Sequence, residues 1–345
     1  MTVISKLRDF FYRHRNKFLV SGIIITGTIF LTRYAQQRLR EWQEREAKEI
    51  LERTRKEQHF ESIERTCNET ILNISNALKE AVAKIIDTDS IVTELRTNPE
   101  NKVELWNDLK VLVFTRAGCL IYLQVMLVIV LRIQLNIIGG YLFKDSSSIS
   151  IESQKKYLSL CNTLLEVGAN KLYNIVKQEF MKILNPIKLT KQLKLKDLDS
   201  IFWSFQTSLT TSNDNPIEHF KDYVVMQDLE NGNELFRNMM NDTVDLLDSE
   251  EVKCLANHCL NRGFVLLSDS VSEYYTPTDK IKEVKDDHEF VHPTDVQIPM
   301  AKLIPIINGL ISKDTFPDQL VQQLIMNAKV KTLGANIYEC FSHVK

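Results

Sequence analysis

Apolar residues in the first third of the chain recur at steps of three and four, which places them on one face of an α-helix. No glycine or proline occurs between Gly27 and Pro99, and residues 33–58 are dense in Arg, Glu, Gln and Lys, which favour helix. This pattern predicts one long helix, with a polar stalk over residues 35–58 that leads into a helical bundle. The apolar face consists of Phe60, Ile63, Cys67, Ile71, Ile74, Leu78, Val82 and Ile85.

An uncharged segment, FLVSGIIITGTIFLT, precedes this stalk and lies between Lys17 and Arg33. As a helix it spans about 22 Å, less than the ~30 Å hydrocarbon core, but the flanking cations can snorkel and extend it. A secretory signal peptide is the alternative, but no small-x-small cleavage site follows. We therefore expect a transmembrane helix over residues 18–34. Charge does not decide its orientation, because arginines flank both ends.

A second uncharged stretch, Ala117–Leu131, allows two interpretations, a second membrane span or a buried central helix. The buried helix is favoured, because the stretch is short, contains Gln124 and continues with polar residues. Asn98-Pro99 is typical of a helix start, and Gly139-Gly140 is expected to end this helix.

The rest of the chain reads as further amphipathic helices joined by loops, with no run that alternates as a strand does. The predicted fold is all-α, an elongated bundle of long helices over residues 59–345. The expected helices cover residues 155–184, 193–209, 234–247, 250–275, 300–310 and 319–341, with a charged loop over residues 276–299.

Composition narrows the class of function. The 345 residues carry a net charge of −2, so no basic excess indicates nucleic-acid binding. The six cysteines are dispersed in apolar or helical contexts, which favours free thiols in a reducing compartment over a disulfide framework.

Two candidate metal sites do not meet the requirements of their chemistry. Residues 288–292 read HEFVH and match the zinc-protease pattern, but Pro293 disfavours the helix that would place both histidines on one face. Cys254, His258 and Cys259 lack an evident fourth ligand. Since the chain also has no phosphate-binding loop and no nucleophile elbow, we expect no enzyme activity, no metal, no cofactor and no small-molecule substrate.

Trp106 lies in the sequence NKVELWNDL, with charged residues at every turn around it. Such a tryptophan is either a core residue near the surface or an exposed anchor in a binding groove. Spacing alone favours the core.

Long segments in order along the chain resemble the peroxin-3 family of peroxisomal biogenesis factors. The resemblance covers the whole chain and is weakest between about residues 144 and 250. The segments are REWQEREAKE (40–49), HFESIERTCN (59–68), NKVELWNDLK (101–110), LRIQLNIIGGY (131–141), CLNRGF (259–264), AKLIPIING (301–309) and ANIYECF (335–341).

The resemblance implies a single-pass protein of the peroxisomal membrane, with the N-terminus in the matrix and the helical bundle in the cytosol. The bundle is then the docking receptor for peroxin-19, the chaperone of new membrane proteins, whose amphipathic N-terminal helix enters an apolar groove at the membrane-distal end. Membrane lipids are the other expected partner. The groove residues that match are Val92, Leu95, Lys102, Trp106, Leu189, Lys302 and Ile304.

The resemblance also implies that the basic cluster within residues 1–17 acts in peroxisomal targeting, through Arg13, His14, Arg15 and Lys17. An alternative role is a membrane tether or adaptor that binds inheritance or autophagy factors through other faces of the bundle. Loss of Trp106 would separate the two, because only docking in the groove depends on it.

Overall fold

A computed structural model describes residues 15–97, 99–145, 147–224, 234–275, 296–313 and 315–343, with side chains from Thr32 onward. Its contacts divide the chain into two compact units, residues 1–59 and residues 60–345. The described residues are mostly helical, which confirms the all-α prediction.

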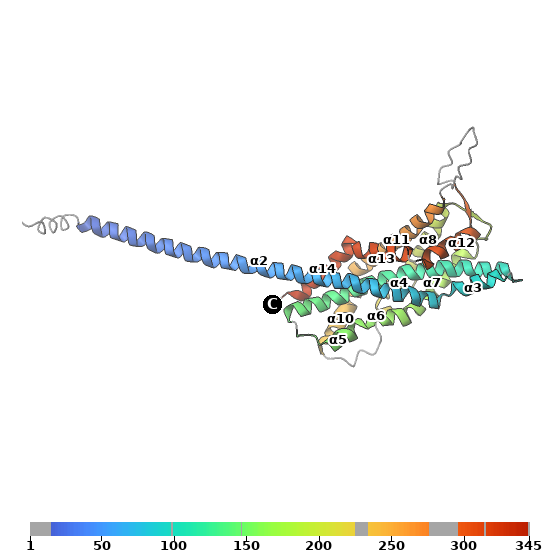
Figure 1. Cartoon of the computed structure of the whole chain (residues 1–345), viewed down its shortest axis with the longest axis horizontal. Coiled ribbons are helices and arrows are strands. Elements are labelled where there is room, and N and C mark those ends of the chain that lie inside the picture. Colours follow the sequence, from blue (N-terminus) through green and yellow to red (C-terminus); the bar gives the residue numbers. More distant parts are fainter. Residues whose placement is uncertain are drawn as a thin grey trace, which may run out of the picture. The chain divides into compact units, whose positions relative to one another are not determined.

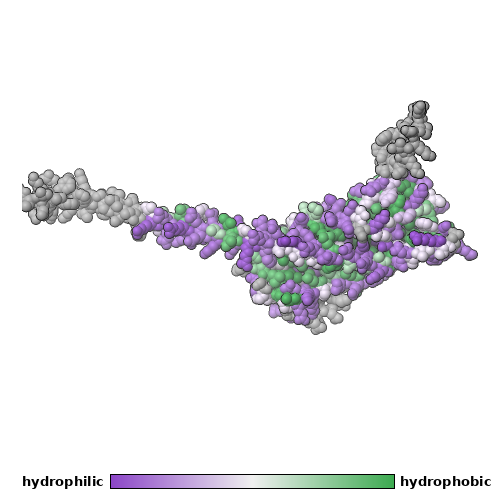
Figure 2. Space-filling view, in the orientation of Figure 1, coloured by the Kyte–Doolittle hydropathy of each residue, from purple (hydrophilic) through white to green (hydrophobic). Residues whose placement is uncertain are grey.

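The long N-terminal helix predicted from the sequence is α2, Arg15–Ile85. In the first unit, the side chains of residues 32–59 are almost all exposed and largely hydrophilic, as Figure 2 shows. This stretch therefore has the character of a polar stalk, although Trp42 and Leu51 are exposed on it. The expected transmembrane helix falls within α2, but its side chains lie outside the described residues up to position 31, so the span stays a prediction.

The centre of the second unit is α4, Lys102–Lys144. Every residue from Ala117 to Leu131 is buried, and α4 contacts the helices on both of its sides (Figure 1). Within the described part of the chain, α4 is the one helix apolar and long enough to cross a membrane, and its apolar window is entirely covered by the bundle. The interpretation of a buried central helix is therefore confirmed.

Polar groups on α4 have partners on α2 inside this core. Gln124 donates a 2.6 Å hydrogen bond from Nε2 to Oγ of Ser75, and Arg132 pairs with Glu64. Arg132 also donates to Oδ1 of Asn68 at 2.6 Å. These contacts explain how the apolar run tolerates a glutamine and an arginine, since a buried polar group is costly only without a partner.

Both predicted ends of the central helix were wrong. The helix begins at Lys102 after Asn101, not at Asn98-Pro99, and it continues past Gly139-Gly140 to Lys144. The glycines serve close packing: a Cβ at Gly140 would lie 2.5 Å from Cβ of Phe341. Phe341 belongs to α14, Ala328–Ser342, which therefore packs against α4 at this point without a side chain between them.

Two predicted helices are interrupted. The helix expected over residues 155–184 is divided by a π-helical turn, Leu164–Gly168. The helix expected over residues 319–341 is broken at Asn327, whose side chain caps α14 by accepting from the Lys329 amide at 2.9 Å. The remaining helices are α3 (Thr88–Arg96), α5 (Ile151–Leu158), α6 (Leu160–Thr163), α7 (Ala169–Leu184), α8 (Leu195–Thr211), α9 (Lys221–Val224), α10 (Glu234–Asp248), α11 (Glu250–Ser272), α12 (Met300–Ser312) and α13 (Thr315–Met326).

A pair of two-residue strands was not predicted from the sequence. β1, Gln192–Leu193, pairs antiparallel with β2, Ile298–Pro299. Strands this short carry no periodicity, so no sequence pattern indicates them. The pair joins the loop after α7 to the start of α12.

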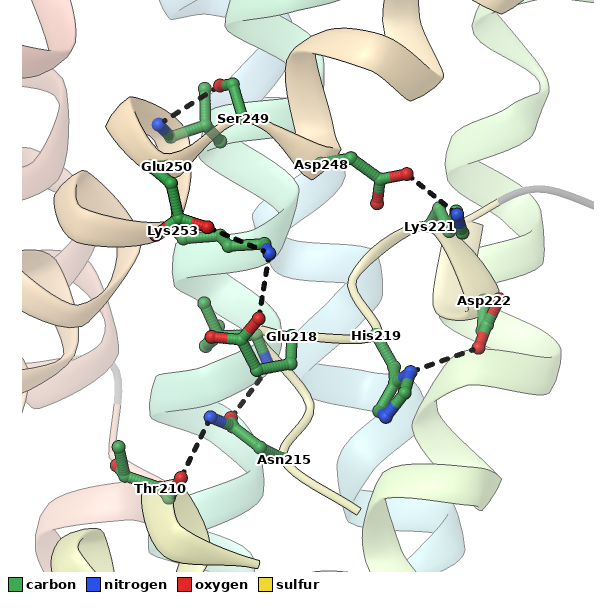
Figure 3. A network of polar contacts seen from close by, with 12 residues as sticks. Thr210, Asn215, Glu218, His219, Lys221, Asp222, Asp248, Ser249, Glu250 and Lys253 are labelled. Atoms are coloured by element: carbon green, nitrogen blue, oxygen red, sulfur yellow. Dashed lines mark hydrogen bonds and ion pairs between the residues drawn. The ribbon is translucent and has the colours of Figure 1, made fainter. Parts of the chain in front are cut away.

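The segment between α8 and α9 is held by a polar network, drawn in Figure 3. Asn215 donates from Nδ2 to the carbonyl of Thr210, at the end of α8, at 3.3 Å. Lys253 on α11 bonds Glu218 at 2.7 Å, and Lys221 bonds Asp248 at 2.7 Å. The network fixes the C-terminal end of α8 against the helices α10 and α11.

Candidate functional site

The expected groove residues come from four segments of the second unit. Val92 and Leu95 lie on α3, Lys102 and Trp106 on the first turns of α4, Leu189 in the loop after α7, and Lys302 and Ile304 on α12. Figure 1 shows α3, α12 and the first turns of α4 toward one end of this unit, with the chain's C-terminus toward the other.

Trp106 is half-buried and packs against the hydrophobic core, and so do Val92, Leu95 and Leu189. Val103, one turn before Trp106 on the same helix face, is 67% exposed. The indole is thus neither sealed in the interior nor fully in solvent. Trp106 packs on the core, as a core residue does, and also keeps some exposed surface, as an anchor in a binding groove does. Apolar side chains that are half-covered in this way leave surface for a partner to bury.

A buried hydrogen-bond chain fixes α3 against α4 and α12. Thr88, the first residue of α3, is fully buried. Its hydroxyl accepts a 2.8 Å hydrogen bond from Nη1 of Arg116 and donates to Oδ1 of Asn308 at 3.0 Å. Asp87 caps α3, because its carboxylate accepts hydrogen bonds from the backbone amides of residues 89 and 90. The bond from the Ser90 amide is the main cause that holds the pKa of the Asp87 carboxyl below its usual range. The positions of Val92 and Leu95 depend on these contacts.

A second set of contacts fixes the loop that carries Leu189. The buried Lys110 donates from Nζ to the carbonyl of Ile187 at 2.7 Å and to Oδ1 of Asn107 at 3.1 Å. Burial lowers the pKa of Lys110. The carbonyl of Leu189 in turn accepts from the amide of Ala301, at the start of α12, at 3.0 Å. The structure therefore brings α4, this loop and α12 together at one place.

Ile304 departs from its expected role, because its side chain is 0% exposed and lies in the core. It supports the surface from beneath and does not line it. The sequence AKLIPIINGLI is apolar on nearly all sides of the helix, so periodicity does not show which residues face outward. Lys302 and Lys102 are both exposed.

Sequence reasoning missed several residues of this region. Val103 and Ile187 could have been found from the sequence. Val103 stands three positions before Trp106, and Ile187 stands two positions before Leu189. The polar side chains that hold the segments together were not, because their partners are distant in sequence. These positioning residues are Thr88, Lys110, Arg116 and Asn308.

Other expectations fall partly or wholly outside the described residues. Arg13, His14 and the HEFVH segment are not described, and for Arg15 and Lys17 only the helical backbone is. Across the described residues, no group of three metal-ligating side chains is present. Cys254 is exposed and Cys259 is buried, so the two do not share a surface.

The comparisons with known proteins bear on the whole chain. The Peroxin-3 family model matches residues 9–100, 96–143 and 142–339. The chain belongs to the peroxin-3 family. Peroxisomal biogenesis factor 3 of Bos taurus is 34% identical over 362 residues, which cover 97% of this chain and 96% of the relative.

Other relatives agree. Peroxisomal biogenesis factor 3 of Homo sapiens is 33% identical over 368 residues, 99% of this chain and 98% of the relative. Peroxisome biogenesis protein 3-1 of Arabidopsis thaliana is 25% identical over 248 residues, 64% of this chain and 68% of the relative. The resemblance found in the sequence is confirmed. Membership assigns the chain to peroxisome biogenesis and to the peroxisomal membrane, in a role that is not enzymatic.

Proposed function

We propose that the chain is a docking receptor of the peroxisomal membrane for peroxin-19. An amphipathic helix of peroxin-19 binds the surface formed by α3, the start of α4, the loop after α7 and α12, named here the Trp106 surface. The observation that carries the proposal is the half-buried Trp106 beside the exposed Val103. The apolar residues of the Trp106 surface are Val92, Leu95, Val103, Trp106, Ile187 and Leu189.

The energetics support a site of this kind. A fully exposed tryptophan side chain presents roughly 150–250 Å² to a partner, and about a third of this area at most is left on Trp106, which is already partly buried. At about 25 cal/mol per Å², burying that remainder contributes on the order of 1–2 kcal/mol to binding. Since nanomolar binding needs about 12 kcal/mol, Trp106 acts with its apolar neighbours and not alone.

Two lysines at this surface can pair with acidic side chains of a partner. Lys102 and Lys302 are exposed at two of its segments. Exposed charges act mainly on the rate of association and on its salt dependence, and less on the final affinity. We therefore expect binding to slow as ionic strength rises.

The proposed receptor is anchored by residues 18–34 and has its N-terminus in the matrix and residues 59–345 in the cytosol. The basic residues Arg13, His14, Arg15 and Lys17 direct it to peroxisomes. Protease treatment of intact peroxisomes tests this topology. It should remove a C-terminal tag and spare an N-terminal one, and the reverse result would overturn the orientation.

The deciding experiment is a titration of the chain with a peptide from the N-terminus of peroxin-19. Trp106→Ala should weaken binding by about 2 kcal/mol or more, as for other anchor residues, without loss of fold. Trp203→Ala is the matched control, because Trp203 is an exposed tryptophan on α8. Wild-type affinity in a folded Trp106→Ala variant would contradict the proposal.

The alternative role, a tether or adaptor for inheritance or autophagy factors, would use faces of the bundle other than the Trp106 surface. It would survive the Trp106→Ala substitution, so the same variant separates the two roles.

A further inference from the structure

A groove separate from the Trp106 surface lies between α8 and α11 and has a volume of about 650 Å³. We call it the α8–α11 groove. Its lining comes from residues 195–211 of α8 and residues 261–269 of α11.

The groove exposes large apolar side chains. Trp203 on α8 is 67% exposed, and Val265 on the facing helix is 59% exposed. Beneath them, the buried rings of Phe202 and Phe264 lie 5.6 Å apart between centroids and connect the groove to the core. An exposed tryptophan above an apolar floor is the arrangement found in protein-binding hot spots.

The groove also contains a hydrogen-bond acceptor without a donor. Oε1 of Gln206 is buried and has no hydrogen-bond partner among the described residues, while its Nε2 donates to the carbonyl of Phe202 at 3.3 Å. Buried polar atoms in proteins nearly always have partners. An N–H donor reaches this oxygen only when the side chains that cover it move, because the atom has almost no surface open to solvent.

The charge of the lining has one sign. Asp199 and Asp269 line the groove, and none of its lining residues is basic. Asp199 accepts a hydrogen bond from the hydroxyl of Ser268, which fixes its carboxylate across the two helices. The potential at the groove therefore favours a cationic ligand, whereas the lysines of the Trp106 surface favour an acidic one.

The geometry fits a helical ligand of about four turns. The lining residues Leu195, Asp199, Trp203, Gln206 and Thr210 follow one another at steps of three and four along α8, over about 22 Å. Both ends of α8 are fixed: Asn215 bonds the Thr210 carbonyl (Figure 3), and Leu193, two residues before α8, accepts from the hydroxyl of Tyr275 at 3.2 Å. The groove is thus formed before any ligand binds.

We propose that the α8–α11 groove is a second protein-docking site, whose occupant is a cationic amphipathic helix of a partner protein. An apolar side chain of that helix packs on Trp203 and Val265, and lysine or arginine side chains face Asp199 and Asp269. The site is independent of the Trp106 surface and of the partner proposed for it.

The test uses the full chain in phosphatidylcholine nanodiscs and two model helices of about 15 residues, one of Leu and Lys and one of Leu and Glu. The Leu–Lys peptide should bind saturably, above the signal of empty nanodiscs, and about tenfold or more tightly than the Leu–Glu peptide. Trp203→Ala should weaken its binding by about tenfold or more. Asp269→Asn should weaken it as well and reduce its salt dependence.

Two matched variants control this experiment. Trp42→Ala removes an exposed tryptophan outside the groove, and Trp106→Ala removes the anchor of the other surface, so both should leave Leu–Lys binding unchanged. The proposal is overturned by equal binding of the two peptides, by no binding above empty nanodiscs, or by unchanged binding in Trp203→Ala. Because Trp203 is exposed, its truncation is not expected to disturb folding.

Discussion

The guanidinium of Arg116 donates a 2.8 Å hydrogen bond from Nη1 to the hydroxyl of Thr88, and this hydroxyl in turn donates a 3.0 Å hydrogen bond to Oδ1 of Asn308. This contact joins α4, α3 and α12 through one side-chain oxygen. Burial lowers the pKa of Arg116, and the nearby carboxylates of Asp89 and Asp87 oppose this. The placement of α3, and with it that of Val92 and Leu95 in the Trp106 surface, rests on a buried hydroxyl.

Thr88→Val should therefore destabilise the chain, because valine keeps the shape of threonine and removes the hydroxyl. Nη1 of Arg116 and Oδ1 of Asn308 then lose a partner, which costs about 1–3 kcal/mol. Affinity for the peroxin-19 peptide should fall as α3 loosens. Thermal unfolding and the peptide titration measure the two effects.

Thr93→Val is the control for this substitution. Thr93 lies on the same helix, but it is exposed and its hydroxyl donates only to the carbonyl of Asp89, at 2.8 Å. Equal melting temperatures for the two variants would show that the buried hydrogen bonds of Thr88 do not hold α3 in place.

The sequence was sufficient to predict the long helices, because their apolar residues are periodic or continuous. α2 follows from steps of three and four, and the burial of α4 follows from an uncharged run that is too short and too polar at Gln124 for a second span. The ends of α4 were not predictable in the same way. Local preference would end the helix at Gly139-Gly140. In the structure the helix continues through them, because Gly140 is needed for the close approach of Phe341.

The candidate site was predictable only as a resemblance, and the physical reason is the distance along the chain between its parts. The pairing of Thr88 with Asn308 spans 220 positions and that of Lys110 with Ile187 spans 77. No local pattern reports contacts of this kind. Ile304 shows a second limit of prediction from sequence. In an almost wholly apolar helix, the sequence does not distinguish a residue that lines the surface from one that lies in the core.

Val103→Glu should weaken binding of the peroxin-19 peptide without loss of stability. Val103 is mostly exposed, so the folded state loses little, but a carboxylate one turn from Trp106 would have to be desolvated beneath an acidic helix. We expect a loss of about 1–3 kcal/mol in the titration. Ile151→Glu is the control: Ile151 is a 72% exposed apolar residue in the first turn of α5, and its substitution should leave binding unchanged. Equal losses in both variants would contradict the position assigned to the surface.

The six cysteines should divide into two classes of reactivity. Cys254 and Cys340 are exposed and should react with iodoacetamide in the native chain, whereas Cys67, Cys161 and Cys259 should not. Burial raises the pKa of Cys67 and of Cys161 to about 12 and that of Cys259 to about 11, so these thiols are protonated as well as covered. Burial also raises the pKa of the fourth buried thiol, Cys119. Mass spectrometry of alkylated peptides, before and after unfolding, measures this division.

The same shifts predict a loss of stability at alkaline pH. Below the thiol pKa of the unfolded chain, 9.0, both states are protonated and the contribution of the thiols is fully present. Above it, the unfolded state loses protons that the folded state keeps, so the free energy of unfolding falls as pH rises toward 12. Cys161→Ala should reduce this slope. A slope unchanged from the wild-type chain would contradict the assigned burial.

Two glycines should respond to alanine with opposite signs, although both lie inside helices of the bundle. A Cβ at Gly140 would lie 2.5 Å from Cβ of Phe341 and 2.9 Å from its carbonyl carbon, so α14 must move away from α4. A Cβ at Gly309 on α12 meets nothing within 4 Å. Gly140→Ala should therefore cost about 1–3 kcal/mol through overpacking. Gly309→Ala should raise the free energy of unfolding by about 0.5–1 kcal/mol, because alanine loses less backbone entropy than glycine when the helix forms. Unfolding by heat or urea measures both, and a Gly140→Ala chain as stable as the wild type would mean that the two helices do not pack as closely as their backbones indicate.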